Sequence, residues 1–418
     1  MLSLKKQLPF YKAGFPKNYR HLLIRKLAAL WLRLNPQVKV IGIVGSYGKT
    51  TTAQTVYQAL NLSGPTLATD INLDTIYNLP LTILKLRRYH RYLVLEIGVD
   101  HQGEMDFHLD LVKPDLLIFT GITPVHAQKG LLNSLDGIKK EKGKAVEAVK
   151  QKEGWVVANA DNLGTKRLIK EKKVKKIIWY GIKSKKADFQ AKEISLNKKG
   201  TAFTIRSKEG EIKVRGQFWG EGYVAAFLGA AGIVHVLKQP LENLVKAGKS
   251  LKALPGRMSL EKGPGGSLLV NDRLRASPAS AKLGLETLAK LPISKRGRKI
   301  VVLGEMGELG RYAKGEHQKV GKLLEILRFD QVIGIGPLLK ETGKKTKITW
   351  AKDIIKAAKV VEKLKLNPKD ILYLKGSLLK HMERLLLYLE GKKVGCQVIS
   401  CDFYKPCDQC EYLKTGLS

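Results

Sequence analysis

The chain has 418 residues, 44% of them hydrophobic, which is enough for two or three domains with real cores and excludes wholesale disorder. Its 75 Lys and Arg residues against 37 Asp and Glu give a net charge of +38, which favours anionic partners such as phosphorylated substrates or an anionic membrane face. Aromatic residues make up only 7%, and no RNA-binding or zinc-finger signature is visible, so nucleic acid is a weak candidate partner.

Residues 1–38 form a basic segment that is expected to contain a helix. In "YRHLLIRKLAALWLRLNP" five apolar residues share one helical stripe: Leu23, Leu27, Leu30, Trp31 and Leu34. Such a stripe fits a helix packed on the next domain, which we favour, or a helix lying on a membrane surface. No apolar run has membrane-spanning length and no signal peptide is visible, so we expect a cytoplasmic protein whose membrane contact would be peripheral.

The remainder predicts two α/β units. Between residues 39 and 250, "YLVLEIGVD", "DLLIFTGI" and "GWVVANAD" alternate with helical stretches and predict buried parallel strands of a doubly wound sheet. Residues 187–216 alternate differently and predict antiparallel hairpins appended to that sheet. Residues 251–392 predict a Rossmann-like α/β domain with strands in "SLLVND", "KIVVLGEM", "DQVIGIG" and "DILYLKG". A cysteine-rich tail, 393–418, follows.

A phosphate-binding loop joins the first strand of this chain to a helix in "VIGIVGSYGKTTTAQ". The ordinary P-loop has a glycine where this chain has Ile43, so the loop is a shorter variant. Backbone N–H groups at such a turn cradle anions, a lysine reaches the terminal phosphates and a threonine hydroxyl can hold Mg²⁺. The predicted ATP contacts are Gly45, Ser46, Gly48, Lys49, Thr50 and Thr51.

With this loop the sequence resembles the Mur ligase family, ATP-dependent enzymes that join amino acids or peptides to a carboxylate. Further segments match the family in order over residues 38–392: "INLDTIYNLPLTIL", "LEIGVDHQGEM", "LPGRM", "VVLGEMGELGRYAKGEHQKVG" and "YLKGSLLKHMERLLLYL". The "LGEMGELG…H…VG" element is specific to the MurF branch. The resemblance implies a central ATP-binding domain, 39–250, and a mobile C-terminal domain, 251–392.

The resemblance also implies roles for single residues in the central domain. Glu96 resembles a Mg²⁺ ligand, and His126 in "TPVHAQKG" resembles the ligand of a second metal. Lys142 corresponds to a lysine that is carbamylated to bridge the metals, although neighbouring lysines leave its register open. Asn72 lies in the segment that contacts substrate. Lys49, His126 and Lys142 are therefore the expected catalytic residues.

In the C-terminal domain, Arg257 resembles a residue that contacts phosphate and Asp272 one that contacts the ribose of ATP. Lys375 is either a further contact of this kind or a plain lysine at a strand end. The implied cofactors are ATP and Mg²⁺. The implied reaction adds D-alanyl-D-alanine to a UDP-MurNAc-tripeptide in peptidoglycan synthesis, so the partner is a nucleotide-linked peptide substrate.

Several departures from the MurF pattern leave alternatives open. The family's Tyr and two Asn are missing from the stretch after Asp272, Gly121 stands where an Asn is usual, and "GEGYVAAFLGAA" replaces groups near the adenine. Only residues 1–38 precede the loop, where MurF carries a uridine-nucleotide-binding domain. A Mur-type ligase for another donor or acceptor, or a catalytically lapsed nucleotide-binding scaffold, therefore remains an alternative.

The four cysteines of the chain are Cys396, Cys401, Cys407 and Cys410, all in the tail. Their spacing, C-x₄-C-x₅-C-x₂-C, contains one CxxC pair and two further thiols. Four thiolates suit a tetrahedral Zn²⁺ site, which we favour over free thiols.

Overall fold

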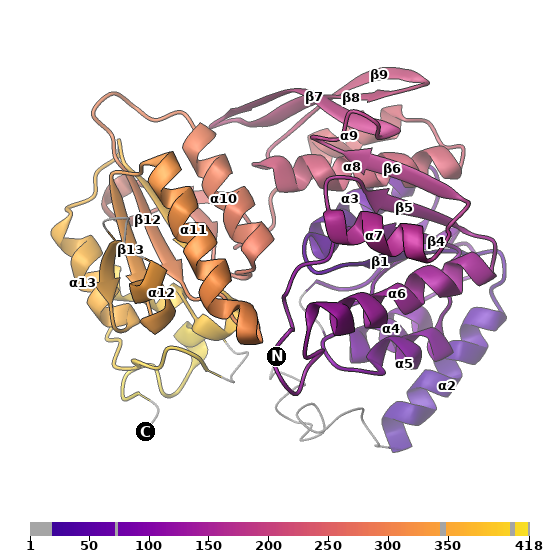
Figure 1. The fold of residues 1–418 in the computed structure, drawn as a ribbon, viewed down its shortest axis with the longest axis horizontal. Helices are drawn as coiled ribbons and strands as arrows, with labels where there is room; N and C mark the ends of the chain where they lie inside the picture. The colour runs from indigo at the N-terminus through magenta and orange to yellow at the C-terminus, as the bar shows by residue number, and fades with distance from the viewer. Residues whose placement is uncertain (1–18, 72–73, 343–347, 402–405, 417–418) are drawn as a thin grey trace. The chain divides into compact units, whose positions relative to one another are not determined.

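The computed structural model describes residues 19–71, 74–342, 348–401 and 406–416. These residues form two compact units, the first from 19–195 with 199–252 and the second from 253–416. Each unit is a sheet covered by helices (Figure 1), which confirms the predicted α/β class. Within the described residues, no helix combines the length and apolar character that crossing a bilayer requires.

The first unit contains a nine-stranded sheet in the order β2-β3-β1-β4-β5-β6-β7-β8-β9. Its strands are β1 (Lys39–Val44), β2 (Thr66–Ala68), β3 (Tyr92–Glu96), β4 (Leu116–Phe119), β5 (Trp155–Asn159), β6 (Ile177–Gly181), β7 (Phe189–Asn197), β8 (Gly200–Ser207) and β9 (Gly210–Gly216). Strand β1 pairs in parallel with β3 on one side and β4 on the other. Strands β2 and β3 are thus added on one side of β1, and β4 and the following strands on the other. At such a switch point, open α/β sheets bind ligands at the carboxyl ends of their strands.

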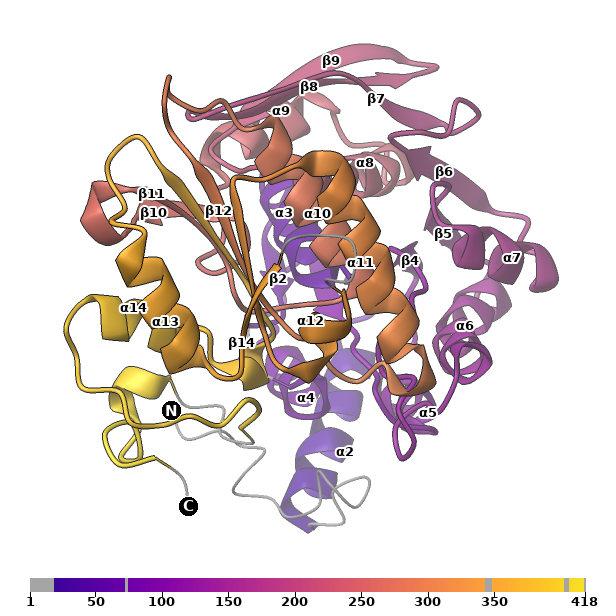
Figure 2. The same ribbon diagram turned by 60° about the vertical axis from the view of Figure 1, so that its left-hand side comes forward.

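Helices cover both faces of this sheet (Figures 1 and 2). They are α2 (Tyr19–Arg33), α3 (Lys49–Asn61), α4 (Thr75–Leu84), α5 (Glu104–Leu111), α6 (Leu135–Gln151), α7 (Leu163–Glu171), α8 (Glu221–Val236) and α9 (Glu242–Ser250). Helix α8 is buried along almost its whole length and packs on α3 and on β5 and β6. Parallel strands buried on both faces explain the continuous apolar runs, such as the "LLIF" of β4.

The edge of the sheet contains the predicted hairpin region. Strands β8 and β9 form an antiparallel pair there. Strand β7 lies next to β8 and joins β6 in parallel, through Tyr180 opposite Phe189. The hairpin region is therefore appended to the sheet through a parallel contact.

Helix α2 packs against α4, as expected, but through a different face from the one predicted. Its buried residues are His21, Arg25 and Ala28, and the Arg25 guanidinium lies 3.5 Å from the centre of the Phe107 ring. The four leucines of the stripe expected to face the core are exposed, with relative exposures of 58% for Leu23, 48% for Leu27, 54% for Leu30 and 62% for Leu34. Trp31, the fifth member, is half-buried, and its Nε1–H donates to the Leu86 carbonyl oxygen at 3.2 Å. The cation–π contact and the small Ala28 allow close packing on the polar side of the helix.

The second unit contains a six-stranded sheet in the order β10-β11-β15-β12-β13-β14, parallel except for β10. Its strands are β10 (Ser259–Lys262), β11 (Leu268–Asp272), β12 (Lys299–Gly304), β13 (Gln331–Ile335), β14 (Ile348–Ala351) and β15 (Ile371–Lys375). Its helices are α10 (Pro278–Lys290), α11 (Ala313–Leu327), α12 (Pro337–Thr342), α13 (Ile354–Lys363) and α14 (Glu383–Leu389). The four predicted strands are confirmed; the short β10 and β14 were not predicted.

Candidate active site

The phosphate loop links β1 to α3 through a sharp turn. Gly48 has φ 72°, a left-handed conformation that favours glycine, and the helix begins at Lys49. The first turn of α3 carries no acidic side chain. The N–H groups of this first turn and the positive end of the helix dipole therefore suit an anion.

The end of strand β4 braces this loop. The Ser46 N–H donates to the Gly121 carbonyl oxygen at 2.8 Å, and the Thr120 hydroxyl donates to the Tyr47 carbonyl oxygen at 2.6 Å. A Cβ on Gly121 would lie 2.5 Å from the Tyr47 ring. The glycine at this position, where the family usually has Asn, is thus matched to the packing of a tyrosine in the loop.

A carboxylate at the end of β3 faces the loop lysine. The Nζ of Lys49 lies 3.9 Å from the Oε1 of Glu96, and these side chains are 13% and 20% exposed. Thr50, the next residue of α3, is buried at 9% exposure. Hydroxyl and carboxylate oxygens are ligands that Mg²⁺ prefers, so Thr50 and Glu96 suit the predicted metal role.

His126 and Lys142 meet at one backbone carbonyl, that of Val99. His126 Nδ1 lies 3.0 Å from this oxygen, and Lys142 Nζ donates to it at 3.2 Å. Because a carbonyl oxygen can only accept, Nδ1 is the donor in this contact, and in the neutral ring Nε2 is the nitrogen with the lone pair. Two residues from a loop and from helix α6 are thus brought together beside the end of β3.

Lys142 is fully buried, at 0% exposure. Burial, followed by the positive charge of Lys49, lowers the pKa of Lys142 from 10.5 to about 7, although Glu104, Asp100 and Glu141 oppose the shift. The other lysines of α6 are half-buried or exposed. Burial therefore singles out Lys142 among the neighbouring lysines that left the sequence register open.

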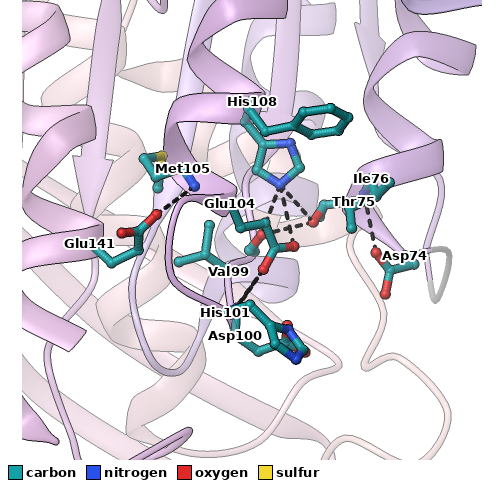
Figure 3. A network of polar contacts seen from close by, with 12 residues as sticks. Asp74, Thr75, Ile76, Val99, Asp100, His101, Glu104, Met105, His108 and Glu141 are labelled. Carbon is teal, nitrogen blue, oxygen red and sulfur yellow. Dashed lines mark hydrogen bonds and ion pairs between the residues drawn. The ribbon is translucent and has the colours of Figure 1, made fainter. Parts of the chain in front are cut away.

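The loop that carries the Val99 carbonyl is shaped by a buried network (Figure 3). Glu104, at 2% exposure, accepts from the N–H groups of Asp100 at 2.8 Å and His101 at 3.1 Å. Its other oxygen lies 3.6 Å from Nε2 of His108, and Glu141 accepts from the Met105 N–H at 2.8 Å. Glu104 thus positions the loop that follows β3. This role was not predicted from the sequence.

In the second unit, Asp272 at the end of β11 belongs to a buried charge cluster. Its Oδ2 accepts from Lys375 Nζ at 2.7 Å and from the Tyr373 hydroxyl at 3.0 Å. Burial raises the pKa of Asp272, while the charges of Lys375 and Arg257 lower it. Lys375 is itself 1% exposed, so it is an interior partner of Asp272.

The MurF-specific element forms a loop held by a neutral histidine. Nε2 of His317 accepts from the Met306 N–H at 3.0 Å, and Nδ1 donates to the Ala313 carbonyl oxygen at 2.7 Å. Burial lowers the pKa of His317. Glu305 in the same loop accepts from the Leu338 N–H at 2.8 Å and lies 3.3 Å from Lys380 Nζ. The signature thus specifies a loop conformation after β12.

Two other predicted sites have different outcomes. Asn72 lies outside the described residues, so its substrate contact stays a prediction. Cys396 and Cys407 are buried, and Cys401 and Cys410 are half-buried. Among the described residues, potential metal ligands converge in two groups, Asp100 with His101 and Glu104, and His381 with Glu383 and Cys407; only Cys407 of the four thiols belongs to either group.

Two protein-family models and a set of relatives match this chain. Residues 43–234 match the Mur ligase middle domain, and residues 256–378 match the Mur ligase glutamate ligase domain. UDP-N-acetylmuramoyl-tripeptide--D-alanyl-D-alanine ligase of Escherichia coli K12 is 30% identical over 313 residues, covering 74% of this chain and 67% of that protein.

Solved structures of MurF ligases are similar to this chain in fold. The crystal structure of MurF from Acinetobacter baumannii has a TM-score of 0.79 and 28% identity, covering 89% of this chain and 81% of that one. MurF ligase from Thermotoga maritima in complex with ADP has a TM-score of 0.76 over 90% of this chain and 85% of that one; at 24% identity this likeness concerns the fold.

Proposed function

Because the chain belongs to the Mur ligase family, we propose that it is an ATP-dependent ligase that adds D-alanyl-D-alanine to UDP-N-acetylmuramoyl-tripeptide. One observation carries the proposal: the phosphate loop, Glu96, and the His126–Lys142 pair lie at the carboxyl ends of adjacent strands around β1. With these substrates the proposed reaction belongs to peptidoglycan synthesis in the cytoplasm.

The proposed reaction has two steps. A donor carboxylate oxygen attacks the γ-phosphorus of ATP, so an acyl phosphate forms and ADP leaves. The acceptor amine then attacks the acyl carbon, the C–N bond forms, and phosphate departs with the bonding electrons. Lys49 and the N–H groups at the start of α3 stabilise the charge on the phosphates during the first step.

Mg²⁺, when bound, would neutralise charge among the phosphates and the donor carboxylate. Thr50 and Glu96 would hold one ion, and Nε2 of His126 would face a second. Lys142 could help to hold this second Mg²⁺ ion only as an anion, because an ammonium group would repel the ion. Its pKa of about 7 leaves much of the side chain as a free amine near neutral pH, which can add to CO₂, form an N–C bond and lose a proton to give a carbamate.

Glu96→Gln is expected to raise the Mg²⁺ concentration needed for half-maximal activity by at least about tenfold, because it removes a negative ligand without changing the shape of the side chain. A Mg²⁺ titration of ADP release measures the shift. Glu153→Gln is a suitable control, because Glu153 is an exposed residue after α6. An unchanged titration for Glu96→Gln would contradict metal binding at this residue.

Substrate identity is tested by ADP release across a panel of donors and acceptors. The proposal predicts that release needs both UDP-N-acetylmuramoyl-tripeptide and D-alanyl-D-alanine. A preference for another carboxylate or amine would favour the alternative Mur-type ligase. Tight ATP binding without turnover on any pair would favour the lapsed scaffold.

We also propose that helix α2 contacts an anionic membrane surface. The exposed leucines at 23, 27, 30 and 34 follow helical spacing along one face. Arg20, Lys26 and Arg33 are exposed on the same helix, and its first turn has no acidic residue. Apolar residues flanked by cations on a surface helix complement the interface of an anionic bilayer.

Replacing all four leucines by serine is expected to abolish sedimentation with vesicles containing phosphatidylglycerol. Binding of the parent should weaken with added salt, because salt screens the attraction between the lysines and arginines and the anionic lipid. Binding should be absent with phosphatidylcholine alone, because this lipid has no net charge. Leu163→Ser serves as the control because Leu163 is 69% exposed but lies on α7. Equal binding by the parent and the four-serine variant would contradict a role for α2.

A further inference from the structure

The C-terminal segment packs beside α14 with little regular structure of its own. Among the described residues after 391, the only regular element is the single 3₁₀ turn η5 (Cys407–Gln409). Its hydrophobic cluster is small and consists of Leu387, Val394, Cys407 and Leu413. Segments with so small a core commonly depend on a disulfide or a metal ion for a fixed structure.

Three potential metal ligands converge where this segment meets α14. The ligand atoms of His381, Glu383 and Cys407 all lie within 4.8 Å of one another. His381 Nδ1 lies 2.8 Å from Glu383 Oε1, and the Cys407 N–H donates to the same oxygen at 3.4 Å. His381 and Cys407 are only 2% and 7% exposed, so the group is largely shielded from solvent.

The turn that carries Cys407 offers a further thiol, that of Cys410, which lies outside this group of three. The Cys410 N–H donates to the Cys407 carbonyl oxygen at 3.1 Å, which closes the CxxC segment into a tight turn. Paired thiolates at this spacing are a frequent half of a tetrahedral zinc site. The second carboxylate oxygen of Glu383 lies 3.8 Å from Arg273 Nε, which would offset part of the negative charge of two thiolates and a carboxylate around Zn²⁺.

We propose that His381, Glu383, Cys407 and Cys410 form a structural Zn²⁺ site that fastens the C-terminal segment to α14. Nitrogen, sulfur and carboxylate donors together suit Zn²⁺. This set differs from the four-cysteine set predicted from spacing. Cys396 is excluded because its buried Sγ accepts from the Arg384 guanidinium at 3.1 Å, and that guanidinium also donates to the carbonyl oxygens of Cys396 and Val398. This sulfur is thus already held by a protein donor.

Zinc content and thermal unfolding of the full chain test the site. The parent, purified without chelators, is expected to hold about one zinc per chain, bound by these ligands. Cys407→Ser and His381→Asn are each expected to lose zinc and to unfold at a lower temperature, while Cys396→Ser keeps the metal. Loss of zinc in Cys396→Ser with retention in His381→Asn would overturn the proposal in favour of four thiolates, and a zinc-free parent would overturn it outright.

Cobalt substitution keeps the test informative if a variant fails to fold. Co²⁺ bound to the parent is expected to give a thiolate charge-transfer band whose intensity corresponds to two sulfur ligands. An intensity corresponding to four sulfurs, calibrated on a Cys₄ zinc protein, would contradict the proposed ligand set. The readout needs no substitution and is independent of ligase activity.

Discussion

Lys49→Ala is expected to lower ATP turnover by about 10²- to 10³-fold while leaving the fold intact. The side chain begins helix α3, beside the turn at Gly48, and its Nζ lies 3.9 Å from Glu96 at the end of the neighbouring strand. Removing the ammonium leaves the developing negative charge on the transferred phosphoryl group without a fixed cation. The partly exposed ion pair with Glu96 contributes little to stability in comparison.

ADP release and thermal unfolding, measured on the same preparation, separate these two effects. Lys85→Ala is the matched control: Lys85 also pairs with a carboxylate, Asp70, at 2.7 Å, but it is 54% exposed and follows helix α4. We expect this control to keep the parent rate. A Lys49→Ala protein that turns over ATP at the parent rate would show that the loop does not bind the reacting phosphates.

Lys142→Met is expected to reduce ligation by at least about a hundredfold, because a buried, uncharged side chain cannot supply the anion that the proposed second metal position requires. Lys144→Gln is the matched control two residues along α6. Burial would lower the pKa of Lys144, but hydrogen bonds to Asp106 and Glu141 raise it, so this lysine stays charged. The control should lose no more than a few-fold in rate.

The carbamate itself can be tested without a substitution. Activity of the parent should fall in CO₂-depleted buffer and return on addition of bicarbonate. Recovery should be faster above pH 7 than below, because the pKa of Lys142 is about 7 and only the free amine adds to CO₂. A ¹³C resonance of a lysine carbamate in labelled parent, absent from Lys142→Met, would identify the group; activity indifferent to CO₂ would contradict it.

The lowered pKa also has a consequence for stability. In CO₂-free buffer the Lys142 amine has its ordinary pKa of 10.5 in the unfolded state and a pKa of about 7 in the native state. Between these pH values the unfolded state therefore holds one more proton than the native state. The free energy of unfolding therefore gains a contribution that rises with pH between these values, and the contribution is lost as pH falls toward 7. Lys142→Met should remove this part of the pH dependence.

Local motifs made much of the fold and of the site predictable. The phosphate loop depends on a strand, glycines and a helix start that are contiguous in sequence, and Glu96 and Asp272 each end a buried strand. The choice among the lysines of α6 was not predictable, because only the packing of the helix shows that Lys142 is the buried one. The role of the Val99 carbonyl was also hidden, since backbone acceptors leave no mark in side-chain patterns.

Tertiary contacts carry information that spacing in the sequence does not. The apolar stripe of α2 has the spacing of a core-facing surface, yet His21 and Arg25 occupy the interface through ring contacts with Tyr77 and Phe107. The cysteine spacing likewise suggested four equivalent thiols. The guanidinium of Arg384 beside Cys396 and the imidazole of His381 near Cys407 come from elsewhere in the sequence, so spacing alone could not separate them.

Transfer of oxygen from the donor carboxylate to phosphate is the most direct test of the central claim. A UDP-N-acetylmuramoyl-tripeptide labelled with ¹⁸O in its terminal carboxylate is incubated with ATP, Mg²⁺ and D-alanyl-D-alanine. If the acyl phosphate forms at this site, the released inorganic phosphate carries one ¹⁸O per ligation, and the peptide product gains the mass of the dipeptide less water. Ligation that yields unlabelled phosphate, or ADP release without any peptide product, would contradict the account.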